Sequence, residues 1–271
     1  MLHWFQAEIE QAVAPLLPGF AVELLPEIDS TNTELMRRAR VGRVEPVLLV
    51  AERQTAGRGR LGRPWQSADA QAGAGTLLFS LGLLLAPRDW SGLSLAVGVS
   101  LADSLEPAGH RLRLKWPNDL WLDDRKLAGI LIETAWPQRP EGEPAGAAAE
   151  GAARYAVIGI GLNLAPRGAE GMTTSPAWLR EIDAAAAAPE VLRRVAAPLV
   201  EALLHFGRQG FASFAPRFAA RDALAGREVV LSDGSAGLAR GVADDGALLV
   251  QGAAGLQRVT SSEISVRPRG R

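Results

Sequence analysis

Residues 54–65, Gln-Thr-Ala-Gly-Arg-Gly-Arg-Leu-Gly-Arg-Pro-Trp, place three arginines, Arg58, Arg60 and Arg63, among glycines. A guanidinium group binds phosphate or carboxylate through two parallel hydrogen bonds, and glycines let the backbone approach an anion closely. The segment therefore predicts a loop that binds a negatively charged substrate and becomes ordered around it. Two other interpretations stay open at this point, a solvated basic loop and a weak arginine–glycine contact with RNA.

The spacing Gly57-x-Gly59-x-x-Gly62 also matches the dinucleotide-binding fingerprint, but we reject that interpretation. The fingerprint must open a helix whose N-terminus holds a pyrophosphate. Here arginines fill the intervening positions, and Pro64-Trp65 follows in place of a helical pattern. No Gly-Lys-Ser/Thr sequence is present, so the segment is not a P-loop either.

Small polar residues precede the second predicted helix in the sequence Asp-Ser-Thr-Asn-Thr-Glu at 29–34. Thr31 with Glu34 three residues later predicts a capping box for that helix. Ser30, Thr31 and Asn32 also carry hydroxyl and amide groups that can pair with a small polar ligand. The two interpretations are compatible.

A turn is predicted after a strand in the sequence Lys-Trp-Pro-Asn-Asp-Leu-Trp, residues 115–121. Its Pro, Asn and Asp residues are types that favour turns. Trp116 and Trp121 are more often core residues than ligand platforms. Lys115 and Asp119 flank the turn, and loops held by rigid strands commonly carry function.

Two further strands contain residues that are unusual for a buried sheet. Lys126 opens the apolar run Lys-Leu-Ala-Gly-Ile-Leu-Ile-Glu, so it must either extend its amine to solvent or find an anion. Gly159 and Gly161 interrupt the apolar segment 157–163, which indicates a bulge or a ligand lying against bare backbone.

Composition excludes several classes of protein. The 271 residues include no cysteine, which removes disulfides, thiol nucleophiles and thiolate metal sites, and only three widely separated histidines, which argues against a histidine zinc site. A formal net charge of −1 gives no general attraction to nucleic acid or anionic membrane. No apolar run is long enough to cross a bilayer, and the N-terminal residues lack a basic secretory region, so we expect a cytoplasmic protein.

The hydrophobic periodicity predicts a mixture of helices and strands followed by a small β region. Helices are expected at 2–17, 33–41, 90–106, 189–206 and 211–223, and strands at 20–25, 47–51, 76–85, 111–115, 120–122, 126–135 and 155–164. Residues 137–154 are expected to form an overgrown hairpin loop of undetermined role. Short strands are expected at 229–231, 237–242, 247–250 and 257–259. We therefore predict domains at 1–224 and 225–271.

Taken together and in this order, five segments resemble the biotin protein ligases, which attach biotin to a lysine of carboxylase carrier domains. The matching segments lie at 29–32, 54–63, 115–120, 126–133 and 159–163. The resemblance implies an α+β catalytic domain like that of class II synthetases. Its central sheet is mixed, mostly antiparallel and flanked by helices, and an SH3-like β-barrel follows it.

The same resemblance implies roles for individual residues. Contacts to biotin are expected from Ser30, Thr31, Asn32, Gln54, Arg58, Gly59, Arg60, Lys126 and Gly129. Contacts to ATP or the adenylate are expected from Arg58, Arg60, Arg63, Trp65, Asn118, Lys126 and Asn163. The expected catalytic residues are Lys126, Arg60, Lys115 and Asp119.

The implied reaction joins biotin to AMP as biotinyl-5′-AMP, releases pyrophosphate, and passes the biotinyl group to a lysine of the carrier. Cations are needed because a carboxylate and a polyphosphate repel each other. ATP and Mg²⁺ are the expected cofactors, with Mg²⁺ carried by ATP rather than by a protein metal site. The acceptor lysine must lose a proton, and Asp119 is the candidate acceptor.

Some family members carry an N-terminal helix-turn-helix and repress transcription. Only about 26 residues precede the first motif, so we expect a ligase without that module and with no nucleic acid or membrane partner. Whether the chain is a monomer or a homodimer stays open. The rival functions are a lipoyl or octanoyl ligase or transferase of the same architecture, and a non-catalytic nucleic-acid binder. A polar Ser-Thr-Asn-Gln set disfavours the apolar head of lipoate, and the near-neutral charge disfavours a nucleic-acid binder.

Overall fold

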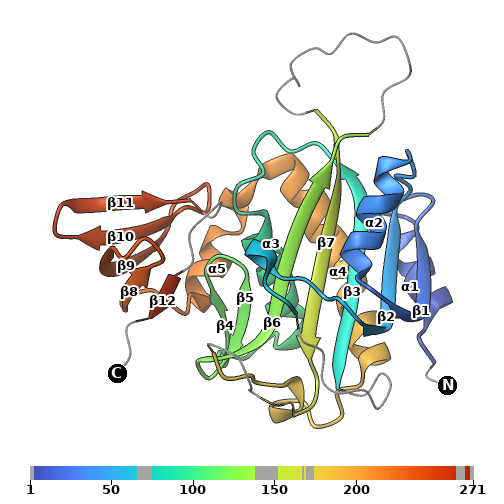
Figure 1. Cartoon of the computed structure of the whole chain (residues 1–271), viewed down its shortest axis with the longest axis horizontal. Helices are drawn as coiled ribbons and strands as arrows, with labels where there is room; N and C mark the ends of the chain where they lie inside the picture. The colour runs from blue at the N-terminus through green and yellow to red at the C-terminus, as the bar shows by residue number, and fades with distance from the viewer. Residues whose placement is uncertain are drawn as a thin grey trace.

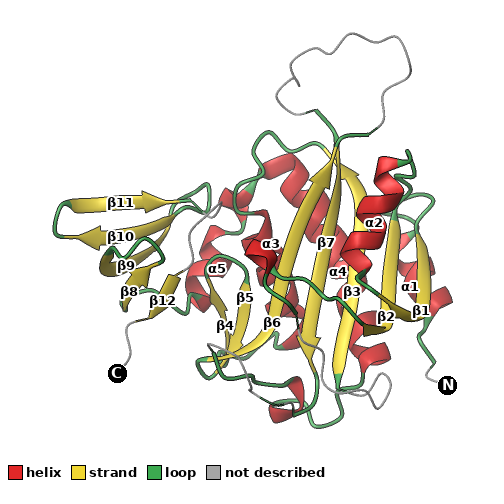
Figure 2. Cartoon of the chain, in the orientation of Figure 1, coloured by secondary structure: helices red, strands yellow, loops and turns green. Residues whose placement is uncertain are grey.

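The computed structural model describes residues 3–65, 75–137, 152–166, 168, 174–260 and 266–268. These residues form two β-sheets and five α-helices (Figures 1 and 2). The helices are α1 (Gln6–Val13), α2 (Thr31–Arg40), α3 (Leu93–Leu105), α4 (Ala188–Gln209) and α5 (Ala215–Arg221). No described helix has the length and apolar character needed to cross a membrane.

The larger sheet has seven strands in the order β1-β2-β3-β7-β6-β5-β4. Its strands are β1 (Ala21–Ile28), β2 (Val47–Gln54), β3 (Thr76–Leu85), β4 (Leu112–Lys115), β5 (Asp119–Leu122), β6 (Arg125–Ala135) and β7 (Arg154–Asn163). Only β1 and β2 run parallel, and every other pairing is antiparallel. The predicted fold class, a mostly antiparallel sheet flanked by helices, is confirmed.

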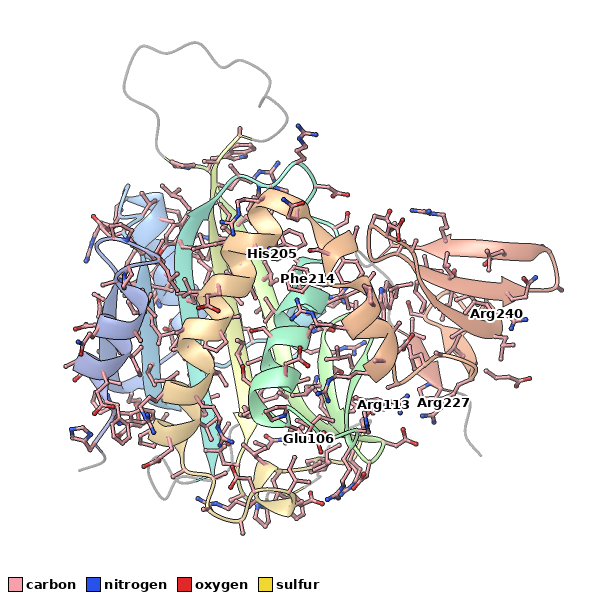
Figure 3. All side chains as sticks on the ribbon, turned by 180° about the vertical axis from the view of Figure 1, so that it is seen from behind. Glu106, Arg113, His205, Phe214, Arg227 and Arg240 are labelled. Atoms are coloured by element: carbon pink, nitrogen blue, oxygen red, sulfur yellow. The ribbon has the colours of Figure 1, made fainter. Side chains whose placement is uncertain are left out.

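Helices cover the two faces of this sheet unequally. The helices α1, α3 and α4 pack behind the sheet over the main hydrophobic core, whereas α2 alone lies on the front face (Figures 1 and 3). The long apolar runs of β3 and β7 follow from this, because a strand buried on both faces needs apolar residues at nearly every position. A smaller cluster lies under α2 and includes Leu35, Leu49 and Tyr155. The part of the front face that α2 leaves uncovered is available for a site.

The smaller sheet contains five antiparallel strands in the order β11-β10-β9-β8-β12. They are β8 (Glu228–Leu231), β9 (Ala236–Val242), β10 (Leu248–Gly252), β11 (Gly255–Val259) and β12 (Val266–Pro268). This arrangement fits the predicted SH3-like domain. The strand β12 was not predicted, because its three residues receive their pairing from β8, which is far away in sequence.

Most predicted elements are present, and the differences have local causes. The helix expected at 2–17 spans only Gln6–Val13. The helix expected at 211–223 is a 3-10 turn at Phe211–Ser213 followed by α5, which begins where Pro216 occupies its first turn. Proline lacks a backbone donor, so it starts a helix more readily than it continues one. Most of the predicted loop 137–154 lies outside the described residues.

Gly82 in β3 leaves room for one side chain from α2 and one from β7 to pack on the front face of the sheet. A Cβ atom at Gly82 would lie 2.0 Å from the Tyr155 hydroxyl oxygen and 3.2 Å from a Leu35 methyl carbon. We expect Gly82→Ala to lower the free energy of unfolding by about 1–3 kcal/mol through overpacking. The measurement is urea denaturation, with Gly207→Ala in α4 as the control.

At Gly207 the nearest atom to an added Cβ is 3.9 Å away, and alanine favours a helix over glycine. The control variant should therefore be as stable as the wild type or slightly more stable. Equal stability of the Gly82 variant and the wild type would show that this contact does not limit the packing of α2.

Candidate active site

A cavity of about 720 Å³ opens on the front face of the large sheet, beside the N-terminus of α2. The segment that follows β2 crosses in front of β3, β7 and β6 and closes one side of the cavity (Figure 1). The site residues predicted from the sequence all line it: Ser30, Thr31, Asn32, Gln54, Arg58, Gly59, Arg60, Arg63, Trp65, Lys115, Asn118, Asp119, Lys126, Gly129 and Asn163. The fold thus brings the predicted residues together from five separate segments.

Glycines form the floor of the cavity where β6 pairs with β7. Gly129 pairs with Gly161 in a continuous antiparallel register, so of the two predicted alternatives, a bulge or a ligand on bare backbone, the bulge is absent at this point. A Cβ atom at Gly161 would lie 2.4 Å from the Trp65 ring, and one at Gly159 would lie 2.1 Å from Asn32 Oδ1. The glycines allow two side chains from distant segments to lie directly on the sheet.

The polar end of the cavity is built at the start of α2. Ser30 caps the helix, and its hydroxyl accepts from the Thr33 amide at 3.3 Å. The predicted capping box of Thr31 and Glu34 is therefore wrong. Thr31 instead directs its backbone amide (2.7 Å) and its hydroxyl (3.1 Å) to Gln54 Oε1, because the parallel pairing of β1 and β2 places Gln54 beside the helix start.

Ser80 lies under these residues and was missed by the sequence analysis. Its hydroxyl is fully buried in β3, 2.7 Å from Thr31 Oγ1 and 2.6 Å from Asn32 Oδ1. A buried polar group needs a partner, so Ser80 fixes the orientation of both side chains. The available signal was a serine inside an otherwise apolar strand.

Glu133 is the second site residue that was not predicted from the sequence. It joins the polar end of the cavity to residues 57–65, the arginine loop. One of its oxygens accepts from Asn32 Nδ2 at 2.9 Å, and the same carboxylate holds the Arg58 guanidinium at 2.7 Å. Glu133 ends the motif at 126–133, but its residue type and position in the sequence indicated no role. Its contacts lie 101 and 75 residues away in the chain, so only the fold reveals them.

The arginine loop turns back on itself and does not open a long helix. The Trp65 amide donates to the Gly57 carbonyl at 2.9 Å, and the Gly59 amide donates to the Arg63 carbonyl at 2.7 Å. Gly62 has a φ of +69°, in the left-handed region that favours glycine. This geometry agrees with the rejection of a dinucleotide fingerprint.

Basic groups from three segments gather around one carboxylate. Lys126 Nζ in β6 lies 2.7 Å from Asp119 Oδ1 in β5. Of the two alternatives predicted for this lysine, extension to solvent or pairing with an anion, the structure shows the ion pair. Lys115 in β4 is the direct pairing partner of Asp119. Arg60 reaches the same region from the loop, where burial lowers its pKa and the charge of Asp119 partly offsets that effect.

Lys115 carries the most perturbed amine in the cavity. Burial and, to a smaller extent, the cations Lys126, Arg60 and Arg63 together lower its pKa to about 8, against the opposing charge of Asp119. Its Nζ lies 5.9 Å from the centroid of the Trp121 ring, which is itself buried as predicted. A lysine with a pKa near 8 changes its charge close to neutral pH.

Asn118 and Asn163 hold the strands at the other end of the cavity. Asn118 Nδ2 donates to the Ile130 carbonyl at 2.8 Å, and Asn163 Nδ2 donates to the Ala177 carbonyl at 3.0 Å. Both amides therefore have a structural function. Among the residues that the structure describes, no three acidic or histidine side chains form a metal-ligand cluster.

Comparison with known proteins identifies the family. Residues 24–140 match the model of the biotin/lipoate A/B protein ligase family, and residues 226–267 match the biotin protein ligase C-terminal domain. The chain is 35% identical over 263 residues to the bifunctional ligase/repressor BirA of Escherichia coli, a match that covers 93% of this chain and 75% of BirA. The chain belongs to the biotin protein ligase family. The resemblance inferred from the five motifs is confirmed.

Two further biotin protein ligases support this assignment. The biotin--[acetyl-CoA-carboxylase] ligase of Paracoccus denitrificans is 32% identical over 253 residues, covering 89% of this chain and 98% of that protein. The biotin protein ligase of Aquifex aeolicus, solved with biotin and ATP, superposes with a TM-score of 0.73 at 29% identity. This match covers 92% of our chain and 99% of the Aquifex chain, so it includes both sheets.

The ion pair between Arg58 and Glu133 should protect the arginine loop of this biotin protein ligase from trypsin, which cleaves after arginine. We expect Glu133→Gln to raise the cleavage rate after Arg58 and Arg60 by up to about fivefold, because a partly exposed ion pair contributes roughly 0.2–1 kcal/mol. Arg63 is followed by Pro64 and is therefore not a trypsin site. Glutamine keeps an acceptor for Asn32, which limits wider damage. Mass mapping of the first fragments gives the rate at each arginine.

Asp183→Asn is the matched control, because it removes an ion pair with Arg194 that does not line the cavity. Its loop should be cut at the wild-type rate. If both variants behave like the wild type, Glu133 does not hold the loop.

Proposed function

We propose that the chain joins the carboxylate of biotin to AMP, releases pyrophosphate from ATP, and transfers the biotinyl group to a lysine of a carboxylase carrier domain. One observation carries this proposal: Lys115, Lys126 and Arg60 meet around Asp119 in a cavity whose adjoining end holds fixed hydroxyl and amide groups. A cationic centre beside a polar, uncharged subsite suits a ligand with an acid group and a polar head.

The cationic centre addresses the main difficulty of the first step. A carboxylate must approach the α-phosphorus of ATP, although both partners are anions that water keeps hydrated and apart. Lys126 and Arg60 offset that repulsion and stabilise the charge that develops at phosphorus. As the ligand binds, Lys126 exchanges its contact with Asp119 for the incoming anions.

The fixed polar end selects the head of the acid. Gln54 and Ser80 orient Thr31, while Ser80 and Glu133 orient Asn32, so their polar atoms keep constant positions. The ureido ring of biotin offers both donors and acceptors to such a subsite. The apolar head of lipoate would leave these groups unpaired, and a site built for hydrogen bonding discriminates strongly against such an analogue.

The arginine loop protects the activated intermediate. A mixed anhydride is hydrolysed when water reaches it, so a loop that closes over the cavity extends its lifetime. The contact between Arg58 and Glu133 gives this loop an attachment point on β6. Arg58, Gly59 and Arg60 act in this way while also facing the ligand.

The second step needs a neutral amine from the carrier. Lysine begins near a pKa of 10.4, so an acceptor for its proton accelerates attack on the biotinyl carbonyl. Asp119 is our candidate, because release of Lys126 to the ligand exposes the carboxylate oxygen that it occupied. AMP is the leaving group.

The nucleotide is assigned to the part of the cavity bordered by Arg63, Trp65, Asn118 and Asn163. Arg63 offers charge to the phosphates, and Trp65 offers a ring face for stacking. Magnesium enters with ATP, whose phosphate oxygens are the ligands that this ion prefers.

The test of function supplies labelled biotin, ATP, Mg²⁺ and a carboxylase carrier domain, and scores label on the carrier lysine. Parallel reactions replace biotin with lipoate or octanoate. We expect transfer of biotin at least about 10²-fold faster than of either analogue, because each leaves buried polar groups unpaired. Preferential transfer of lipoate or octanoate would refute the biotin assignment.

Lys126→Ala should strongly impair adenylate formation. We expect biotin-dependent pyrophosphate exchange to fall by about 10²–10³-fold, because removal of one preorganised donor to a developing charge has effects of that size. Lys126→Arg keeps the positive charge and should retain more activity than the alanine variant. Urea denaturation of both variants separates a folding defect from a chemical one. Exchange within about twofold of the wild type in Lys126→Ala would exclude this role.

A further inference from the structure

The chain contains only two lysines among its 29 basic residues, Lys115 and Lys126. Both line the cavity. Every other lysine-or-arginine position along the chain is an arginine, including those in the segments that the structure does not describe. The outer surface of this protein therefore offers no lysine amine.

This distribution matters for an enzyme that makes an acyl adenylate. Such an anhydride acylates any neutral amine that it meets. A guanidinium group carries its charge up to a pH above 12 and has no comparable lone pair. Arginine can therefore bind the phosphate of the adenylate without being acylated by it.

Most basic residues around the cavity are arginines, which the adenylate does not acylate. Apart from the two lysines, the basic side chains that line the described cavity are Arg58, Arg60, Arg63, Arg125 and Arg227. Arg227 directly precedes β8, the first strand of the smaller sheet, and its guanidinium lies 2.6 Å from Asp124. Figure 3 shows Arg227 at the junction of the two sheets and Arg240 on the outer part of the smaller one.

The two lysines differ in their capacity to attack an acyl group. Lys126 Nζ lies 2.7 Å from the Asp119 carboxylate, and an ammonium group held in an ion pair has no lone pair to donate. No ion pair engages Lys115 among the described residues, although Asp119 is its pairing partner across the β4–β5 hairpin. Both amines border the place where the carboxylate of the acid must be activated.

We propose that Lys115 is the one side chain of this protein that its own biotinyl adenylate acylates. This inference rests on the proposed function. The neutral Nζ attacks the biotinyl carbonyl, a C–N amide bond forms, and the C–O bond to the phosphate breaks. AMP departs with that electron pair, and the proton lost from Nζ passes to solvent. The modified lysine occupies the cavity, so enzyme kept without its carrier loses activity progressively.

The electrostatic surroundings of Lys115 define how the modification depends on pH. Burial and the cations Lys126, Arg60 and Arg63 lower the pKa of Lys115 to about 8, against the opposing charge of Asp119. A group with that pKa is about one-tenth neutral at pH 7 and about nine-tenths neutral at pH 9. The phosphate of the bound adenylate is an anion that raises this pKa, so the initial rate of acylation per bound adenylate should rise at least about tenfold over this range.

The experiment incubates the full chain with synthetic biotinyl adenylate at pH 7 and pH 9, without carrier, and maps the modified peptides by mass spectrometry. A parallel sample receives biotin, ATP and Mg²⁺ and is assayed for pyrophosphate release. The synthetic adenylate bypasses the first chemical step. Failure of the proposed function therefore removes the signal from the second sample only.

We expect one biotinyl group on Lys115, forming at least about tenfold faster at pH 9 than at pH 7, and none in Lys115→Arg. Arg227→Lys combined with Asp124→Asn places an amine without its ion-pair partner on the cavity lining, and this double variant should gain a second modified position. Arg240→Lys places the same amine on an exposed part of the smaller sheet and should gain none. These variants distinguish acylation at the cavity from acylation by adenylate free in solution.

Three results would overturn the proposal. The first is an unmodified protein that binds the adenylate at both pH values. The second is a biotinyl group on Lys126 or on the α-amino group in place of Lys115. The third is equal modification of positions 227 and 240, which would show that acylation is not confined to the cavity.

Discussion

The site depends on an excess of positive charge around a single carboxylate. Asp119 contacts Lys126 directly and pairs with Lys115 across the β4–β5 hairpin. Arg60 lies close enough for the charge of Asp119 to oppose the lowering of its pKa by burial. One negative charge does not neutralise three positive ones, and burial weakens the screening by water. The lowered pKa of Lys115 is one expression of that imbalance. Bound anions neutralise this excess of positive charge. The fold therefore places the cations where a carboxylate and a phosphate can bind.

The glycines of β6 and β7 explain how so many segments reach one place. A sheet with ordinary side chains on its front face would hold Asn32 and Trp65 several ångströms away. At Gly159 and Gly161 these side chains lie on the backbone itself. The same feature links the polar end to the arginine loop, since Glu133 lies on β6 and contacts both Asn32 and Arg58. The site can form because glycines in the sheet let side chains from distant segments lie directly on the backbone.

Sequence patterns predicted the parts of this fold that local chemistry determines. The apolar runs of β2, β3 and β7 and the helical spacing of α3 and α4 were recognised because burial imposes them along the chain. The start of α2 was misassigned, because Ser30 and Thr31 are both good caps and only the position of Gln54 decides between them. Pairings between distant segments could not be predicted in this way.

In the candidate site too, residues in local motifs could be predicted from the sequence, whereas residues that act through distant partners could not. The motif residues were found because their types and order are specific, and they meet in one cavity. Ser80 and Glu133 escaped because their importance lies in partners about 50 and 100 residues away. Trp65 was assigned to the nucleotide from its motif alone, and its position over Gly161 became visible only in the folded chain.

The C-terminal sheet contributes to the site through the turn that carries Lys115 and Asp119. The Trp116 indole donates to the Gly246 carbonyl at 3.0 Å, and a Cβ atom at Gly246 would lie 2.7 Å from Gly92 Cα. The turn is therefore held between the smaller sheet and the start of α3. The strand β4 is the edge strand of the large sheet, where it pairs with β5, so the contacts from the smaller sheet add support to this short hairpin. The charge cluster around Asp119 keeps its geometry because a second sheet packs against the residues beside it.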